Sequence, residues 1–426
     1  MRQVKIAIMG MGTIGSGVYR VVEKEGDYIA HKEAIELSVK SVLSLAYSIP
    51  IPDEKKVASI EDIVNDPEIE TVVEVMGGVE PAKTFITKCL RAGKNVVSAN
   101  KELIAQHWAE LEGEAKKTGA GFYFEASVGG GIPILRAVTD SLQANTITEV
   151  YGIINGTTNY ILTKMSDEGL DYADVLKEAQ ALGYAEANPT ADVEGYDAMY
   201  KLSILASMAF HVRLPIEHIL REGISNITKA DIAAAKELGM EIKLLAIGKR
   251  EGEHVELRVH PTMIPKDHPL AGVKGSFNAI MVHGSAVDDV MFYGRGAGDL
   301  PTASAIVSDI LYAARTKEHR YMTFMNEQKK LSPTLVFNTD WQTGCYIRLN
   351  VADKPGAMAR IADIMGKNNV NLHSVLQKET DGKVASIVFM VKKAHEQSLQ
   401  NAIKEIKALD DVIEVCNVIR VETFEK

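Results

Sequence analysis

The first 130 residues alternate between short apolar runs and stretches in which apolar residues recur at helical spacing. Five of the runs predict strands: Val4–Met9, Leu37–Leu45, Thr71–Val75, Asn95–Val97 and Phe122–Phe124. Helices are predicted over 81–92 and 101–118, and helix ends that need a left-handed residue are predicted at Gly26, Gly93 and Gly119. Strands that alternate with helices are typical of a parallel, doubly wound α/β sheet.

The pattern changes after about residue 130. A strand over Thr146–Ile154 and a helix-rich stretch to about 240 precede strands predicted over 242–248, 254–263, 276–283 and 287–293. This order favours an α+β domain with helices on one face of a mostly antiparallel sheet. A further helix, Thr302–Arg315, is expected to return to the first domain, and residues 326–344, with Pro333, have the composition of a linker.

The last part of the chain predicts the order βαββαβ, over Tyr346–Val351, 356–368, Asn371–Glu379, Ala385–Lys392, 395–408 and Val412–Val421. We therefore expect four parts: a first domain over 1–130, a second over 131–320, a linker over 321–345 and a last domain over 346–426.

A glycine-rich turn follows the first strand. Gly10 permits a tight turn, Gly12 lets the backbone approach a pyrophosphate, and Gly15 allows helix and strand to pack closely. The phosphates would then lie on the free N–H groups of a helix that starts at Thr13 and Ile14. Glycines also occur in ordinary turns, but here a strand precedes the motif and an apolar-periodic helix follows it. The first domain is therefore predicted to be a Rossmann-type domain that binds NAD(P).

Composition narrows the class of protein. The chain has 46% hydrophobic residues, and its net charge of −10 is spread along its length, which disfavours nucleic acid and membrane as partners. Cys89, Cys345 and Cys416 form no C-x-x-C pair, which speaks against a disulfide framework or a zinc site. The chain enters a strand directly and has no apolar run of membrane-spanning length, so we expect a cytoplasmic location.

Lysines and carboxylates mark a candidate for catalysis. Lys101 follows a strand of the first sheet, where ligands of open α/β sheets bind, although it is also explained as the start of a solvated helix. Asp197 and Lys201 are four residues apart and share one face of an apolar helix. A surface ion pair is the alternative, but a helix this apolar should be buried, and burial lowers the pKa of a lysine toward the range useful for proton exchange.

Three small-residue turns allow close backbone approach to a ligand, around Glu125–Pro133, Asn155–Asn159 and Tyr293–Gly298. Carbonyl groups in such turns can coordinate a hard cation. A turn before a helix explains each of them equally well.

Together these motifs resemble one family, homoserine dehydrogenase. The matching segments occur in order over most of residues 1–320: GMGTIG, VVSANKELIA, FEASVGGGIPILR, IINGTTNYIL, GYAEANPTADVEGYDAMYKLSILA and YGRGAGDLPTASAIVSD. The resemblance implies reversible, nicotinamide-dependent reduction of L-aspartate 4-semialdehyde to L-homoserine, on the way to threonine and methionine. It also implies that residues 131–320 serve the substrate and dimerisation, and that the chain is a monofunctional enzyme and a homo-oligomer, a dimer or tetramer.

The resemblance also implies roles for single residues. Lys201 would be the acid/base that protonates the developing alkoxide, with Lys101 beside it, while Glu186 and Asp197 bind the amino-acid part of the substrate and Asp192 supports the lysines. A structural, sodium-like cation would be held by Glu125 and the carbonyls of Val128, Gly130 and Ile132. The cofactor contacts expected in this way are Gly10, Gly12, Thr13, Ile14, Gly15, Ala99, Lys101, Gly183, Glu186 and Gly298.

The choice between NADP and NAD depends on the end of the second strand. NAD-specific domains usually carry an acidic residue there and NADP-specific ones an arginine, whereas this chain has Ser44–Ser48 with neither. Lys55 and Lys56 follow and can reach a phosphate, although a solvated loop is the simpler role for them. We expect NADP as the cofactor, with the use of NAD left open.

The last domain resembles the ACT domains found behind metabolic enzymes, on its βαββαβ order and the turn Asp353–Met358. The resemblance implies feedback regulation by an amino acid, threonine, near Gly356 and Asn371; a module that serves only dimerisation is the alternative.

Two other functions fit parts of the sequence. A non-catalytic nucleotide sensor has the same folds, but it has no use for paired lysines. A phosphorylating semialdehyde dehydrogenase needs a cysteine nucleophile in a strand-end turn, whereas Cys89 is predicted in a helix, Cys345 in the linker and Cys416 in the last strand.

Overall fold

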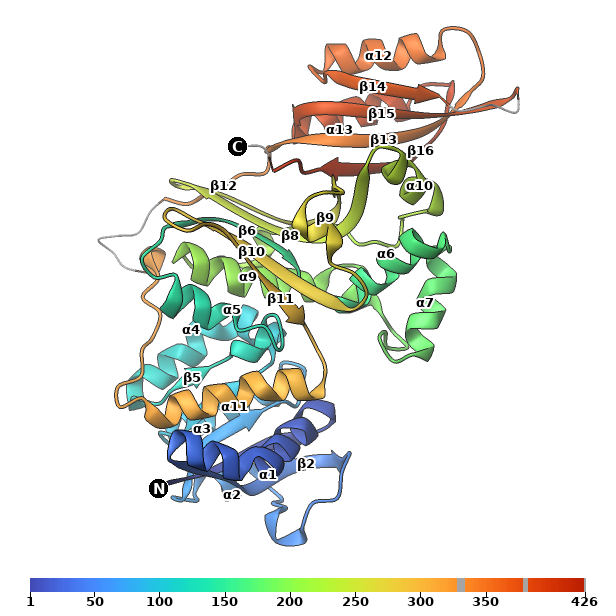
Figure 1. Cartoon of the computed structure of the whole chain (residues 1–426). Helices are drawn as coiled ribbons and strands as arrows, with labels where there is room; N and C mark the ends of the chain where they lie inside the picture. The colour runs from blue at the N-terminus through green and yellow to red at the C-terminus, as the bar shows by residue number, and fades with distance from the viewer. Residues whose placement is uncertain (328–333, 378–381, 425–426) are drawn as a thin grey trace. The chain divides into compact units, whose positions relative to one another are not determined.

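The computed structural model describes residues 1–327, 334–377 and 382–424, which form two compact units (Figure 1). The first unit contains Met1–Gly156, Asp197–Ile219 and Phe277–Leu335; the second contains Thr157–Tyr196, Leu220–Ser276 and Val336–Lys426. Residues 328–333 of the predicted linker, with Pro333, lie outside the described residues. The predicted domain ranges remain a prediction.

A five-stranded parallel sheet forms one part of the first unit. Its strands are β1 (Arg2–Met11), β2 (Ile35–Tyr47), β3 (Ile69–Glu74), β4 (Asn95–Ser98) and β5 (Phe122–Tyr123), in the order β2-β1-β3-β4-β5. The predicted doubly wound sheet is therefore confirmed. The strand order reverses between β1 and β3, and ligands of such sheets bind at the carboxyl ends beside that point.

The sheet is covered by α1 (Thr13–Glu33), α2 (Ile60–Val64), α3 (Ala82–Arg91), α4 (Lys101–Thr118) and α11 (Asp299–Arg315). Alternate strand residues face opposite sides, so Val73 and Val97 join the core beneath α1 and α11, while the equally buried Val72 and Val96 point the other way. Figure 1 shows the orange α11 alongside the blue α1. Ala303 and Ile306 of α11 pack in the same core as β1, as expected for the helix predicted to return to the first domain.

The predicted helix end at Gly26 is wrong. The first helix continues to Glu33, and its left-handed C-cap is Ala34, with φ 56°. Buried Val22 and Ile29 extend the apolar face past the glycine, so packing outweighs its weak helix propensity. Gly93 and Gly119 do adopt positive φ beyond their helices, at 76° and 77°.

The rest of the first unit contains an antiparallel sheet of β6 (Ile147–Ile153), β10 (Phe277–Gly284) and β11 (Asp288–Arg295). It also contains the short helix α5 (Ile134–Arg136), which continues as a π-turn over Ala137–Ser141, and α9 (Tyr196–Phe210) from Asp197 onward.

The second unit has a mixed sheet built on β8 (Met240–Glu251) and β9 (His254–Pro265), which are antiparallel. Two short strands, β7 (Leu220–Arg221) and β12 (Val336–Phe337), pair with β9 in parallel. Its helices are α6 (Gly156–Glu168), α7 (Tyr172–Ala181), α8 (Thr190–Val193) and α10 (Lys229–Glu237). Single 3₁₀ turns elsewhere in the chain span Asp53–Lys55, Glu125–Ser127, Ile216–His218, Pro269–Gly272 and Met325–Glu327.

The predicted βαββαβ order of the C-terminal part is confirmed. It consists of β13 (Gln342–Ala352), α12 (Ala357–Lys367), β14 (Leu372–Gln377), β15 (Val384–His395), α13 (Glu396–Lys407) and β16 (Val412–Val421). Positions 378–379 of the predicted strand Asn371–Glu379 lie outside the described residues. Cys345 lies in β13 and not in the linker, because the strand begins four residues before the predicted one.

Strand β16 joins this C-terminal sheet to the rest of the second unit. Arg420 and Val421 pair in parallel with Thr262 and Met263 of β9, so the sheet runs β8-β9-β16-β13-β15-β14. The pattern of the sequence did not predict this continuity.

Candidate active site

The glycine-rich turn has the geometry that a pyrophosphate needs. Gly10 has φ 100°, and a Cβ there would lie 2.7 Å from the carbonyl oxygen of Val75. A Cβ on Gly15 would lie 1.9 Å from the Gly10 oxygen, so strand and helix are as close as glycine allows. A Cβ added at Gly12 would meet nothing within 4 Å. Helix α1 begins at the next residue, Thr13, which is followed by Ile14. The start of α1 is therefore open to an anion.

The carboxyl ends of β3 and β4 carry a second polar cluster, which the sequence analysis missed. Glu74 is fully buried, and its carboxylate accepts hydrogen bonds from Ser98 Oγ at 2.6 Å and from the Met76 N–H at 2.9 Å. Burial raises the pKa of Glu74 above its usual range despite these bonds. The sequence held a signal for it, because Glu74 directly follows the apolar residues Val72 and Val73 at the end of a predicted strand. Ala99, expected to contact the cofactor, follows β4 and donates its N–H to the Glu74 carbonyl at 3.4 Å.

Two lysines meet on one buried carboxylate. Lys201 Nζ lies 2.6 Å from Asp197 Oδ2 one turn away on α9, and Lys101 Nζ, from the first residue of α4, lies 3.1 Å from Asp197 Oδ1. Asp197 and Lys201 are both buried, as expected for this apolar helix, whereas Lys101 keeps 41% of its side chain exposed. The start of α4 is capped by Asn100, whose side chain accepts from the Leu103 N–H.

Two residues after β6 complete this network. Lys201 Nζ also donates to the Ile154 carbonyl at 2.8 Å, and Asn155 Nδ2 donates to Asp197 Oδ2 at 2.9 Å. Burial would raise the pKa of Asp197, but the charges of both lysines and the Asn155 hydrogen bond outweigh it and hold the pKa well below its usual range. Asp197 is therefore ionised at neutral pH. Asn155 belongs to one of the small-residue turns, but the sequence does not predict it as a site residue, because its partner Asp197 lies far away in the chain.

The predicted residues Gly183, Glu186 and Asp192 belong to the second unit. Gly183 has φ 76° after α7, and exposed Glu186 accepts a bond from Gln180 Nε2 at its carbonyl, 3.0 Å. Asp192 lies half-buried in α8. These three residues therefore lie in the stretch of the second unit that runs from the end of α7 to α8.

The turn around Glu125 packs against the turn before α11. The Gly131 N–H donates to the Arg295 carbonyl at 3.0 Å, and a Cβ on Gly130 would lie 2.4 Å from the Gly296 oxygen. Gly298, expected to contact the cofactor, is the N-cap of α11, with φ 114°. Two of the three small-residue turns are thus in contact, and their glycines are required for it.

The Glu125 carboxylate is occupied by backbone donors. Its oxygens accept the N–H groups of Leu135 and Arg136 at 2.9 and 2.8 Å, and the Glu125 N–H donates to Asp309 at 2.9 Å. Burial, with the charge of Asp309 beside it, raises the pKa of Glu125 to about 7. Among the described residues, no group of three or more His, Cys, Asp or Glu side chains is arranged to hold a metal ion.

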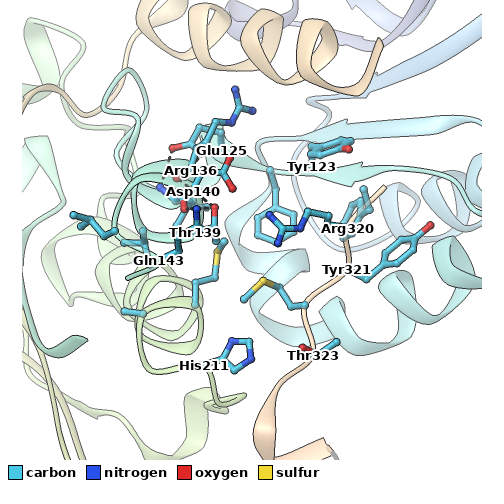
Figure 2. Close-up of a pocket in the computed structure, with 18 of the residues that line it drawn as sticks. Tyr123, Glu125, Arg136, Thr139, Asp140, Gln143, His211, Arg320, Tyr321 and Thr323 are labelled. Atoms are coloured by element: carbon cyan, nitrogen blue, oxygen red, sulfur yellow. Dashed lines mark hydrogen bonds between the residues drawn. The ribbon is translucent and has the colours of Figure 1, made fainter. Parts of the chain in front are cut away.

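A cavity of about 510 Å³ opens beside this turn. Figure 2 shows Glu125 and Arg136 on one side of it and Arg320 and Tyr321, from a later stretch of chain, on another. Neither Lys101 nor Lys201 is among its lining residues. The cavity is therefore separate from the lysine network.

The two residues predicted to bind an effector lie around α12. Gly356 is its N-cap, with φ 87°, and Asn371 follows it, exposed, with its carbonyl accepting the Lys392 N–H at 2.9 Å.

Comparison with known proteins identifies the family. The model of the homoserine dehydrogenase NAD-binding domain matches residues 10–125, that of homoserine dehydrogenase matches 133–311, and that of the ACT domain matches 346–411. A homoserine dehydrogenase of Bacillus subtilis (strain 168) is 38% identical over 99% of both chains. The chain belongs to the homoserine dehydrogenase family.

Solved structures of the family agree. A homoserine dehydrogenase from Thiobacillus denitrificans superposes with a TM-score of 0.92 and 37% identity, covering 100% of this chain and 99% of that one. A hyperthermophilic archaeal homoserine dehydrogenase in complex with NADPH covers 75% of this chain, with a TM-score of 0.63 and 28% identity.

Family membership makes the chain an NAD(P)-dependent oxidoreductase that uses a nicotinamide cofactor, with an ACT domain at its C-terminus. The expectation of an enzyme is confirmed, and the sensor alternative is not supported. The cysteines do not support the alternative of a phosphorylating semialdehyde dehydrogenase. Burial raises the pKa values of Cys89 and Cys345, which leaves their thiols poor nucleophiles. None of the helices in the described residues has the length and hydrophobicity to cross a bilayer.

Proposed function

We propose that the protein reversibly reduces L-aspartate 4-semialdehyde to L-homoserine, with NADP as its preferred cofactor. The observation that carries the proposal is that two ammonium groups lie on the single carboxylate of Asp197. One belongs to Lys101, which starts α4 just after the carboxyl end of β4, and the other to Lys201 of α9. Ligands of a doubly wound sheet lie at that edge.

The charges suit the reaction. Two cations on one anion leave a net positive charge, which stabilises an oxygen that becomes negative when the aldehyde is reduced. A bound nicotinamide supplies the hydride. Lys201 exchanges the proton with the substrate oxygen, as a buried donor held in place by Asp197 and the Ile154 carbonyl. Lys101, more exposed, positions the substrate beside it.

The substrate's ammonium group needs carboxylates. We assign it to Glu186 and Asp197, with Asp192 in support, as the family resemblance implies. Because Asp197 already accepts from both lysines and Asn155, it also orients the proton donor.

The preference for NADP is supported by cations near the end of β2. Lys56 Nζ lies 5.2 Å from the centre of the Tyr47 ring, and Lys55 Nζ lies 3.1 Å from the Tyr19 hydroxyl. Lys56→Ala is expected to raise the KM for NADP about tenfold and leave that for NAD unchanged, since only NADP has a 2′-phosphate. Equal effects on both would contradict a phosphate contact.

A sodium-like cation belongs to the same proposal. Because backbone N–H groups occupy the Glu125 carboxylate, the peptide oxygens of Glu125, Val128, Gly130 and Ile132 would hold the ion, which stabilises the turn without entering the reaction. Replacing sodium by a large organic cation should lower the melting temperature of the protein.

Regulation and assembly complete the proposal. The ACT domain supports feedback inhibition by an amino acid, and we assign threonine as the effector and a homo-oligomer as the assembly, in the cytoplasm. An ACT domain that serves only dimerisation would leave activity insensitive to threonine.

The deciding experiment is the L-homoserine-dependent reduction of NADP at alkaline pH, followed by absorbance and repeated with NAD and with added threonine. A homoserine-dependent signal that is larger with NADP is expected. Folded protein that binds nucleotide but shows no signal with either cofactor would overturn the proposed reaction.

A further inference from the structure

A second cavity, of about 280 Å³, lies within the second unit, between strand β16 and the loop 221–227, which begins at the last residue of β7. It is smaller than the cavities that take drug-sized ligands, so only a small molecule fits it. It lies away from Gly356 and Asn371, neither of which lines it.

The lining carries both signs of charge. Glu194 and Glu222 supply carboxylates and Arg221 a guanidinium, while Ile227, Val418 and Ile419 add apolar surface. Arg221 is held flat, because its guanidinium lies 3.7 Å from the centre of the Tyr196 ring and one of its five donors bonds the Glu194 carbonyl. A guanidinium held in one orientation matches the carboxylate of an α-amino acid, the two carboxylates match its ammonium group, and the small apolar surface matches a short side chain.

The loop 221–227 is bonded to β16 on one side of the cavity and to the end of α8 on the other. On one side Arg420 of β16 bonds Glu222 at 2.7 Å, and Asn417 Nδ2 donates to the Asn226 carbonyl at 3.0 Å. On the other side the Ile224 N–H donates to the Val193 carbonyl at 2.8 Å, at the end of α8.

We propose that this cavity binds a small α-amino acid as its zwitterion, with the carboxylate on Arg221 and the ammonium on Glu222 and Glu194. The inference rests on the proposed function, since it identifies the site through which an amino acid regulates that reaction. The feedback inhibitor and the amino-acid product share this chemistry.

The loop 221–227 links the cavity to α8, the helix that contains Asp192. Glu194 is two residues from Asp192, and Ser225 Oγ bonds the Glu194 carboxylate. A ligand that draws Glu194 and Glu222 together would therefore constrain the end of α8, the helix that carries Asp192.

Isothermal titration calorimetry on the full-length protein tests the proposal, with L-threonine and L-homoserine as separate probes and without nucleotide. L-threonine amide, which lacks the carboxylate, and N-acetyl-L-threonine, which lacks the ammonium, test the two ends of the zwitterion. The variants are Arg221→Gln, Glu222→Gln and, as the matched control at the other candidate site, Asn371→Ala. Melting temperatures show whether each variant folds.

We expect Arg221→Gln and Glu222→Gln each to weaken L-threonine binding about tenfold or more, as loss of a charge-assisted contact does. Asn371→Ala should leave it unchanged. The amide should bind wild type weakly and lose little more in Arg221→Gln, because both changes remove the same contact. L-homoserine binding that Arg221→Gln and Glu222→Gln weaken shows that the cavity takes the product. L-homoserine binding that both variants leave unchanged belongs to the proposed active site and, without L-threonine binding, overturns the inference.

Loss of binding in Asn371→Ala alone, or no binding of either amino acid to the wild-type protein, would overturn the inference. Homoserine-dependent reduction of NADP, measured on the same samples, separates the two failures: an active enzyme whose cavity variants bind normally disproves the site and not the reaction.

Discussion

Three donors converge on the carboxylate of Asp197, and that convergence determines what each partner can do. Lys201 is buried and has a carbonyl as its second partner, so its ammonium group has one orientation. Lys101 is partly exposed and can follow the substrate. This difference assigns proton exchange to Lys201 and positioning to Lys101 in our proposal.

Lys201→Met should lower kcat by about 100- to 10,000-fold, the usual contribution of a general acid or base. Binding of NADP, measured by fluorescence titration, should stay nearly unchanged, since the proposed role is at the substrate oxygen. Lys94→Met is the matched control: this lysine is also buried, but it donates to the carbonyls of Asp66 and Ile69 at the amino edge of the sheet. A similar loss of kcat in both variants would point to a folding defect.

Lys243 predicts a pH effect on stability. Its ammonium group is buried against the Val273 carbonyl and Asn159 Oδ1, and burial lowers its pKa to about 8. Above pH 8 the unfolded chain binds more protons than the folded one, so the free energy of unfolding of the wild type relative to Lys243→Met should rise between about pH 8 and pH 10, by up to about 3 kcal/mol. Urea unfolding at several pH values measures this difference. A flat difference would show that the buried lysine titrates normally.

The first helix shows how packing overrides local propensity. A glycine at position 26 predicts an end, yet α1 extends to Glu33 because its apolar face continues on the core of the sheet. Gly10 and Gly15 of the glycine-rich turn differ from Gly26, since their roles depend on close backbone contacts that the local sequence does imply.

Gly26→Ala should raise the free energy of unfolding by about 1 kcal/mol, because an added Cβ meets nothing within 4 Å and alanine is the better helix former. Thermal or urea unfolding gives the value. Gly15→Ala is the contrasting variant, expected to destabilise and to weaken NADP binding, because its Cβ would collide with the Gly10 carbonyl. Destabilisation by Gly26→Ala would mean that the helix is strained there.

Strand pairing and buried ion pairs, as well as the linker, join the ACT domain to the rest of the second unit. Strand β16 pairs with β9, and Arg348 of β13 bonds Asp231 of α10 at 2.8 Å. Asp231 is fully buried; burial would raise its pKa, but Arg348 and Asn417 hold it below the usual range. Arg258 of β9, equally buried, pairs with Glu422 at 3.0 Å. Both of these ion pairs need the ACT domain, although Arg258 keeps a second partner, Glu256, on its own strand.

Deleting residues 340–426 should therefore lower the soluble yield and the melting temperature instead of producing a threonine-insensitive enzyme. The deletion exposes the edge of β9 and leaves Asp231 and Arg258 without the ion-pair partners that the ACT domain supplies. Asp363→Ala, at an exposed position of α12, is the control and should change neither. A stable, active truncated protein would show that the second unit folds without its C-terminal sheet.

Local sequence by itself determined the parallel sheet, the dinucleotide turn, the buried helix with Asp197 and Lys201, and the βαββαβ order. Each of these depends on residues close together in the chain, through hydrophobic period, glycine conformation or i,i+4 spacing. Only the tertiary structure decided that Lys101 and Asn155 meet Asp197, that Glu74 is buried beside Ser98, and that β16 continues the sheet from β9. The reason is physical: long-range partners are selected by the need to bury faces and satisfy polar groups together, and no local pattern records which distant residue meets that need.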